Sequence, residues 1–343
     1  MDFRFVHLAD LHFSVYPSHV NPLDRRDKSR LHKAAWILER KRRSGPWSLP
    51  TTFEPDVAVV LARDLKDKVQ SKSIDGIIVT GDLATTGHER DLNVAKQFLT
   101  GKLGPEFVLS DLGGGFMNFF AALPVIVLPG NHDRYTENFA GWSQQFEAKR
   151  NFSPAWCGGY KHVNRVTADS NSKRLRYSVF EKGGEKLILV QADFSLKRWF
   201  DADLTMGVAG ILGQGYAYND VIKSLKALTA RLRDKFSCRT VIWLCHFPPD
   251  PNDDSACPAN MEMRYGSRLS KAASASDVKY ILAGHIHRHI CYSPISGLEV
   301  ICSASATDPV DTPSFNEITF SVSGGRLIGA EWQVRSYSGG SFV

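Results

Sequence analysis

Short apolar runs recur along the chain, and most of them end at a polar residue that begins a turn. Runs of about four to eight residues rich in valine, isoleucine and leucine are typical of strands that are buried on both faces. Such runs predict strands at residues 3–9, 76–80, 124–128, 240–245, 278–283 and 300–303. Two pairs of runs predict hairpins, namely 175–180 with 187–191, joined about Gly183-Gly184, and 315–322 with 327–334.

Apolar positions at helical spacing lie between several of these runs. They predict helices over residues 29–43, 56–70, 88–99 and 219–235. Residues 101–120 contain three consecutive glycines and are expected to form a connection that includes some helix. Helices alternate with strands early in the chain, whereas the later strands follow one another closely. This order favours an α/β fold with mixed sheets over one with a purely parallel sheet.

No internal repeat, low-complexity segment or long linker interrupts this pattern. One domain spanning residues 1–343 is therefore the simplest organisation, although a chain of this length could also bury two modest cores. Residues 134–174 and 196–218 are rich in aromatic, glycine and polar residues. Together with residues 247–265, we expect them to form loops that determine the choice of substrate.

The composition is that of an ordinary globular protein, with 43% hydrophobic and 23% charged residues. No apolar run approaches the roughly 20 residues that a membrane-spanning helix needs. The first nine residues lead directly into a strand instead of a leader peptide, so a cytoplasmic location is expected. The six cysteines show no CxxC spacing, which predicts reduced thiols and gives no support for a zinc finger.

The net charge of +6 comes from one segment. Residues 24–43 hold nine lysine and arginine residues and three acidic ones, so the remainder of the chain is neutral overall. This basic segment could bind a polyanion such as nucleic acid, an anionic lipid surface or a nucleotide. It could also be the solvated face of the predicted helix, which is the more common role of such a run.

Five short polar blocks follow apolar runs along the chain. They are Asp10-Leu11-His12, Gly81-Asp82, Gly130-Asn131-His132-Asp133, His246 and Gly284-His285-Ile286-His287. Each block is expected where a buried strand ends, which is the edge of an α/β sheet at which ligands bind. A single block of this kind often has only a structural role, but five of them at successive strand ends are hard to obtain by chance.

The spacing and the residue types within the blocks point to metal ions. In an extended chain, residues two apart point the same way, so Asp10 and His12 could converge on one ion, and His285 and His287 repeat this spacing. Glycine precedes the polar residues of three blocks, where it would let the backbone turn sharply and approach a metal closely. Carboxylate, imidazole and amide ligands without thiolate suit Mn, Fe or Zn, and one carboxylate can bridge two ions roughly 3.5–4 Å apart.

The blocks resemble the signature of the calcineurin-like metallophosphoesterase superfamily. The similarity runs from residue 3 to about residue 307, and every block of the signature is present. The stretches HLADLHF, GDLATTG, LPGNHDRY and GHIHRH are most similar to the bacterial class III cyclic-nucleotide phosphodiesterase (Icc-like) branch. The resemblance implies an α/β fold that forms a four-layer α/β/β/α sandwich with two mixed β-sheets.

The resemblance also implies a dinuclear centre and a role for each polar residue. Two divalent or mixed-valence ions (Mn, Fe or Zn) would each have three terminal ligands and would share one carboxylate. The ligands would be Asp10, His12 and His287 for the first ion, Asn131, His246 and His285 for the second, and Asp82 for both. His132 resembles the catalytic histidine of the family. Asp133 would hold its neighbours in place or cap a helix, and would not bind a metal.

The implied reaction is hydrolysis of a phosphate ester, either a diester or a monoester. The substrate would be small, with a cyclic nucleotide as the specific candidate. A hydroxide bridging the two ions would attack the phosphorus, and His132 would protonate the leaving oxygen. Arg134 and Tyr135 directly follow this block and could contact the substrate, although Tyr135 could equally pack beneath the loop. The sequence has no motif for a phosphorylated serine or cysteine intermediate.

Two other functions fit the same blocks. A DNA nuclease similar to the nuclease subunit of the SbcCD repair enzyme would share them and the HLADLH opening, but that branch has longer C-terminal segments that bind DNA. Outside residues 24–43 the chain lacks the basic stripe that a duplex requires, so nucleic acid is less favoured than a small phosphate ester. A scaffold that kept the fold and lost catalysis would have lost ligands, and this sequence retains all of them.

Overall fold

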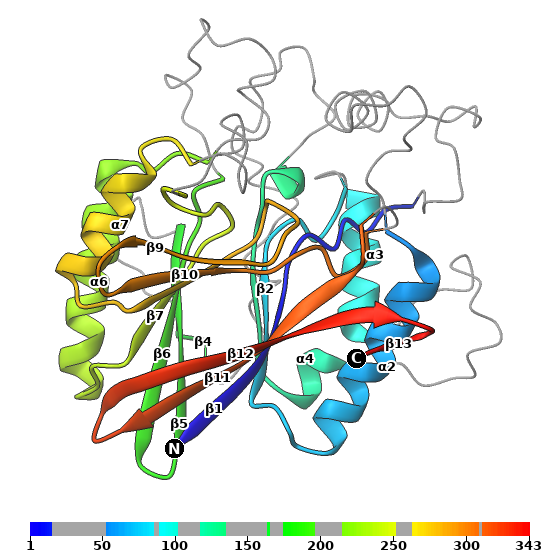
Figure 1. Ribbon diagram of the computed structural model, residues 1–343, viewed down its shortest axis with the longest axis horizontal. Helices are drawn as coiled ribbons and strands as arrows, with labels where there is room; N and C mark the ends of the chain where they lie inside the picture. Colours follow the sequence, from blue (N-terminus) through cyan, green and yellow to red (C-terminus); the bar gives the residue numbers. More distant parts are fainter. Residues whose placement is uncertain are drawn as a thin grey trace, which may run out of the picture.

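A computed structural model gives the arrangement of the chain in space (Figure 1). It describes residues 1–15, 53–85, 89–101, 117–134, 163–164, 174–195, 215–251, 263–308 and 311–343, with only the backbone at 89, 134 and 163–164. The basic segment, Tyr135, the side chain of Arg134 and most of the three expected loops lie outside this description. No helix in the described part of the chain is long and apolar enough to cross a membrane.

The first of two mixed sheets has the strand order β13-β12-β11-β1-β2-β3. Strands β1, β2 and β3 run parallel, and β11 pairs with β1 in the antiparallel sense. The parallel strands therefore have their carboxyl ends at one edge of the sheet. The strands of this sheet are β1 (Asp2–Leu8), β2 (Gly76–Thr80), β3 (Val125–Leu128), β11 (Ser314–Ser323), β12 (Arg326–Ser338) and β13 (Ser341–Phe342).

The second sheet has the strand order β4-β5-β6-β7-β8-β10-β9. Its central strands β6, β7, β8 and β10 are parallel, and the outer strands β5 and β9 pair in the antiparallel sense. The strands are β4 (Val163–Asn164), β5 (Leu175–Lys182), β6 (Glu185–Ala192), β7 (Val241–Leu244), β8 (Tyr280–Ala283), β9 (Ile290–Ile295) and β10 (Leu298–Cys302).

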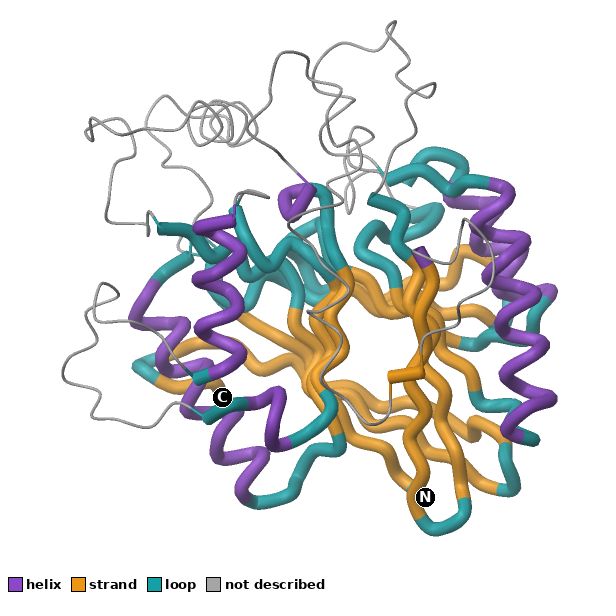
Figure 2. The backbone as a smooth tube through the Cα atoms, turned by 180° about the vertical axis from the view of Figure 1, so that it is seen from behind, coloured by secondary structure: helices purple, strands orange, loops and turns teal. Residues whose placement is uncertain are grey.

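Helices cover the outer face of each sheet, as the two opposite views show (Figures 1 and 2). One apolar core lies between the first sheet and its helices, and a second core lies between the second sheet and its helices. A third core joins the inner faces of the two sheets. The helices are α2 (Pro55–Gln70), α3 (Glu89–Thr100) and α4 (Phe119–Ala122) on the first sheet, and α6 (Asn219–Phe236) and α7 (Gly266–Ala275) on the second.

The alternation of side chains along each strand produces these layers. In β1, Phe5 lies in the core between the sheets, and the next residue, Val6, packs toward the helices. In β7, Ile242 faces the other sheet and Trp243 faces the helices in the same way. Apolar side chains on both faces explain why these strands are uninterrupted apolar runs in the sequence. The four-layer α/β/β/α sandwich with two mixed sheets is confirmed.

Three elements of the second sheet's half were missed by the sequence analysis. Strand β4 has only two residues and lies within residues 134–174, which were expected to form a loop. Strand β9 lies at the sheet edge, carries Pro294 and alternates between half-buried and exposed residues, so its apolar signal is weak. Helix α7 is short and buries mainly small residues such as Ala272 and Ala273, which leave little helical periodicity. The other strands and helices expected within the described residues lie within a few residues of their predicted bounds.

Candidate metal centre

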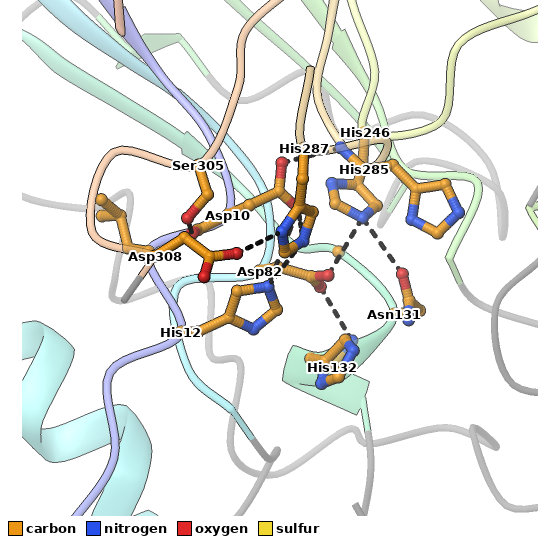
Figure 3. Close-up of polar contacts among 12 residues, drawn as sticks. Asp10, His12, Asp82, Asn131, His132, His246, His285, His287, Ser305 and Asp308 are labelled. Atoms are coloured by element: carbon orange, nitrogen blue, oxygen red, sulfur yellow. Dashed lines mark hydrogen bonds and ion pairs between the residues drawn. The ribbon is translucent and has the colours of Figure 1, made fainter. Parts of the chain in front are cut away.

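The five polar blocks meet at the carboxyl ends of strands β1, β2, β3, β7 and β8 (Figure 3). Three of these strands belong to the first sheet and two to the second. A parallel bridge between Ala9 and Ser305 connects the end of β1 with the segment that follows β10. The seven side chains predicted as ligands lie together there, and each is at most 5% exposed: Asp10, His12, Asp82, Asn131, His246, His285 and His287.

One group of donor atoms is formed by Asp10, His12 and His287. The Nε2 atoms of the two imidazoles lie 3.0 Å apart. The Oδ1 atom of Asp10 is 3.5 Å from Nε2 of His287 and 4.0 Å from Nε2 of His12. The three donors thus face a common point, as ligands of a single ion do.

A second group is formed around His246. Its Nε2 atom lies 3.3 Å from Oδ2 of Asp82 and 3.1 Å from Oδ1 of Asn131. His285 joins this group, because its nitrogen lies within 4.8 Å of the donor atoms of Asp82 and His246. Asp82 also forms a group with His12 and His132, so its carboxylate lies between the two sets of donors (Figure 3).

The donor atoms of both groups fit metal ions. Nitrogen and oxygen ligands at about 2.0–2.2 Å from an ion lie about 3–3.5 Å from one another, which is close to the spacing seen in each group. The buried Oδ1 of Asp10 finds no hydrogen-bond donor among the described residues, whereas its Oδ2 accepts the backbone N–H of His285 at 2.8 Å. A cation between Asp10, His12 and His287 would satisfy this oxygen.

Hydrogen bonds at Nδ1 determine which ring nitrogen faces the centre. Nδ1 of His246 donates to the carbonyl of Thr80 at 2.7 Å, and Nδ1 of His132 donates to the carbonyl of Thr85 at 2.8 Å. A carbonyl only accepts, so the proton of each neutral ring is on Nδ1 and Nε2 is left as the lone-pair donor. No sequence signal marks these backbone partners, because the fold alone brings the carbonyls to the rings.

Five of the seven predicted ligands have a left-handed backbone, with positive φ angles at Asp10 (52°), His12 (47°), Asp82 (49°), His285 (74°) and His287 (53°). Asp10 and His12 do lie in one group, as their spacing predicted, but the backbone there is left-handed and not extended as that prediction assumed. It is also wrong that His285 and His287 face one ion by their spacing, because they belong to different groups. Such conformations typically cost about 1–3 kcal/mol each and are common at functional sites.

Two glycines let the ligand loops approach each other closely. Gly81 has φ of 101°, and a side chain there would overlap the ring of His246. A side chain at Gly130 would overlap the Asp82 carboxylate, and its Cβ would be 2.6 Å from the backbone nitrogen of Asp82. The sequence predicted that these glycines would let the backbone approach a metal closely. In the structure they let the backbone approach the side chains of His246 and Asp82.

Gly130→Ala should therefore destabilise the protein and displace Asp82. We expect a loss of about 1–3 kcal/mol in the free energy of unfolding, as overpacked sites commonly show. The matched control is Gly329→Ala, since Gly329 has no atom within 4 Å of an added Cβ and no positive φ. Denaturant unfolding and metal content would be measured for both. Equal stability and equal metal content in the two variants would contradict the claim that a side chain at position 130 displaces Asp82.

Asp133 connects the loops that follow β2 and β3. Its buried carboxylate accepts the backbone N–H groups of Gly130 at 2.9 Å, Leu83 at 3.2 Å and Ala84 at 2.9 Å. Burial and the nearby Asp82 raise the pKa of Asp133 to about 7, although the three N–H donors act in the opposite direction. It lies inside the short helix η2 (His132–Arg134) and belongs to none of the groups of donor atoms described above.

Burial and charge set the protonation of the central side chains. Burial, reinforced by His132 and His287, lowers the pKa of His12 well below its ordinary value. Burial also disfavours a charged His246, but the Asp82 carboxylate outweighs it and raises the pKa of His246 to about 9. Burial likewise opposes ionisation of Asp82, yet the imidazoles of His246 and His132 hold its pKa well below the usual range. A metal ion that binds Nε2 of His246 must therefore displace a proton.

A family model described as calcineurin-like phosphoesterase matches residues 3–289. No curated protein sequence matches the chain. A solved dimetal phosphatase from Danio rerio is similar, with a TM-score of 0.52 and 13% identity over 98% of this chain and 99% of that one. GAP50, the anchor in the inner membrane complex of Plasmodium, has a TM-score of 0.49 and 11% identity over 100% of this chain and 87% of that one. At 13% identity, the likeness to the dimetal phosphatase concerns the fold alone.

Proposed function

Because the chain belongs to the calcineurin-like phosphoesterase family, we propose that it hydrolyses a small phosphate ester at a centre of two metal ions. Family membership makes the chain a metal-dependent phosphoesterase, which is the class of enzyme that the sequence predicted. The observation that carries the proposal is the convergence of seven buried donor side chains in two neighbouring groups, with Asp82 in the group around His246 and also close to His12 of the other group. Mn, Fe and Zn all suit this donor set.

The residues have separate roles in this proposal. Asp10, His12 and His287 hold the first ion, and Asp82 is shared with the second ion, whose other ligands are Asn131, His246 and His285. Bound metal ions supply a nucleophile from water near neutral pH and stabilise charge on the phosphate. As an imidazolium with a proton on each nitrogen, His132 would contact a phosphate oxygen and give its Nε2 proton to the leaving oxygen, which leaves the neutral ring with its Nδ1–H bonded to the carbonyl of Thr85.

The proposed substrate is a small diester, and a cyclic nucleotide is the specific candidate. The support for it is the similarity of the four sequence stretches at strand ends to cyclic-nucleotide phosphodiesterases. Arg134 remains a candidate contact for the substrate, because its backbone belongs to η2 together with His132. Monoesters and DNA are the alternatives that an assay has to separate from it.

The test begins with the metal content of the purified full chain. We expect two ions per chain after loading with Mn²⁺, and Mn²⁺-dependent hydrolysis of bis-p-nitrophenyl phosphate. Elemental analysis that found one ion or none would contradict the dinuclear centre. A panel of phosphomonoesters, small diesters, cyclic nucleotides and DNA would then identify the substrate class. Faster turnover of DNA than of every small diester would favour the nuclease alternative, and two bound ions without any turnover would favour a scaffold.

A further inference from the structure

Asp308 is a buried carboxylate beside the first group of donors that the sequence analysis did not single out. It is 1% exposed, and its Oδ2 lies 3.1 Å from Nδ1 of His287 (Figure 3). The carboxylate accepts, so Nδ1 of His287 carries the proton in the neutral ring. Its Nε2 is then the lone-pair donor that faces His12 at 3.0 Å.

The segment that carries Asp308 is fastened to the Asp10-Leu11-His12 block. The hydroxyl of Ser305 donates to the carbonyl of Asp10 at 2.6 Å, and the hydroxyl of Thr307 donates to the carbonyl of Leu11 at 2.5 Å. The backbone N–H of Ala306 donates to the carbonyl of Ala9 at 3.3 Å. Asp308 is therefore held in a fixed position relative to the first group.

This contact distinguishes the two groups electrostatically. The corresponding Nδ1 atom of His246 is held by the neutral carbonyl of Thr80, so the group around His246 gains no charge from that contact. The group around His287 instead has a carboxyl group one ring away from the metal position. A carboxylate behind a ligating imidazole fixes the ring and makes its other nitrogen a stronger donor.

We propose that Asp308 is a positioning residue that holds Nε2 of His287 toward the first metal ion and strengthens binding at that site alone. The inference rests on the proposed two-metal function. Loss of a partner of this kind typically weakens metal binding by about 10–100-fold. Asp308→Asn keeps the size of the side chain and removes the carboxylate. It is expected to weaken binding of the first ion by about this factor and to leave binding of the second ion unchanged.

Titration calorimetry with Mn²⁺ alone, on the metal-free full chain, tests this inference. The control is Asp311→Asn, because Asp311 is an exposed carboxylate three positions further along the chain and its loss changes the net charge equally. Two backgrounds separate the ions, since His285→Ala keeps the ligands of the first ion and His12→Ala keeps those of the second. We expect Asp308→Asn to weaken Mn²⁺ binding in the His285→Ala background and to leave it unchanged in the His12→Ala background.

Equal weakening of Mn²⁺ binding in both backgrounds would overturn the inference. Unchanged Mn²⁺ binding in both backgrounds would overturn it as well. Circular dichroism checks that each variant is folded, and Asp308→Ser replaces Asp308→Asn if the latter does not fold. The wild-type titration distinguishes a failure of the proposed function from a failure of the inference about Asp308. Fewer than two ions bound by the wild type would contradict the proposed function, and the inference with it. Two ions bound with no dependence on Asp308 would overturn only the inference.

Discussion

Replacing Asp82 by alanine should abolish turnover more completely than the loss of any terminal ligand. The Asp82 carboxylate lies between the two sets of donors of the proposed centre. Its donor atom is within 4.8 Å of that of His12 in the first set and of that of His246 in the second. Its Oδ1 also accepts the backbone N–H of His132 at 2.8 Å. The substitution therefore removes a ligand from each ion and releases the loop that carries the proposed acid.

The expected loss is at least about 10³-fold in turnover, because metal ions contribute several kcal/mol and each 1.36 kcal/mol corresponds to a factor of ten. Turnover of a small diester and metal content would be measured for Asp82→Ala and for Asp82→Asn, an isosteric variant without the charge. The comparison is His285→Ala, which removes a terminal ligand of one ion and should be restored in part by excess Mn²⁺. Near-normal turnover of Asp82→Ala with both ions bound would contradict the shared role.

His132→Ala should keep both metal ions and lose most turnover, by an amount that depends on the leaving group. The ring of His132 lies 4.7 Å from that of His12, centroid to centroid, yet its Nδ1 is held by the carbonyl of Thr85. Only Nε2 is then able to exchange a proton with a substrate. Proton donation is worth about 10²–10⁴-fold in rate, and it matters most for a basic alkoxide such as a ribose oxygen.

The measurement compares an alkyl or ribose ester with a nitrophenyl ester, since nitrophenolate leaves without a proton. The loss in His132→Ala should be larger for the alkyl or ribose ester. His132→Gln is a useful companion, because glutamine can donate a hydrogen bond but cannot transfer a proton, and it should show the same dependence. Equal losses on both esters would mean that His132 mainly positions the phosphate. A missing ion would mean that His132 is itself a ligand.

Most of the strands could be predicted because burial on both faces requires continuous apolar runs, as in β2 and β7. The ends of β1, β2, β3, β7 and β8 were equally visible, since each of these five runs stops where a polar block begins. Elements with weaker burial could not be found in this way. Strand β9 has exposed and half-buried positions, and α7 buries small side chains, so neither has a strong apolar pattern.

The sequence by itself determined which residues could bind metal, because carboxylates, imidazoles and an amide at successive strand ends have few other uses together. The resemblance to a known family implied how they divide between two ions, whereas their spacing did not. His285 and His287 are two residues apart and belong to different groups, but Asp10 and His12, with the same spacing and the same left-handed backbone, belong to one.

Only the tertiary structure decided which groups support these residues. The carbonyls that hold His132 and His246 belong to distant segments, and every residue has a carbonyl, so no sequence pattern marks them. Asp308 is 21 positions from His287, in a segment that is fastened to the Asp10-Leu11-His12 block. Contacts of this kind depend on how two sheets pack against each other, and local residue patterns carry no information about that packing.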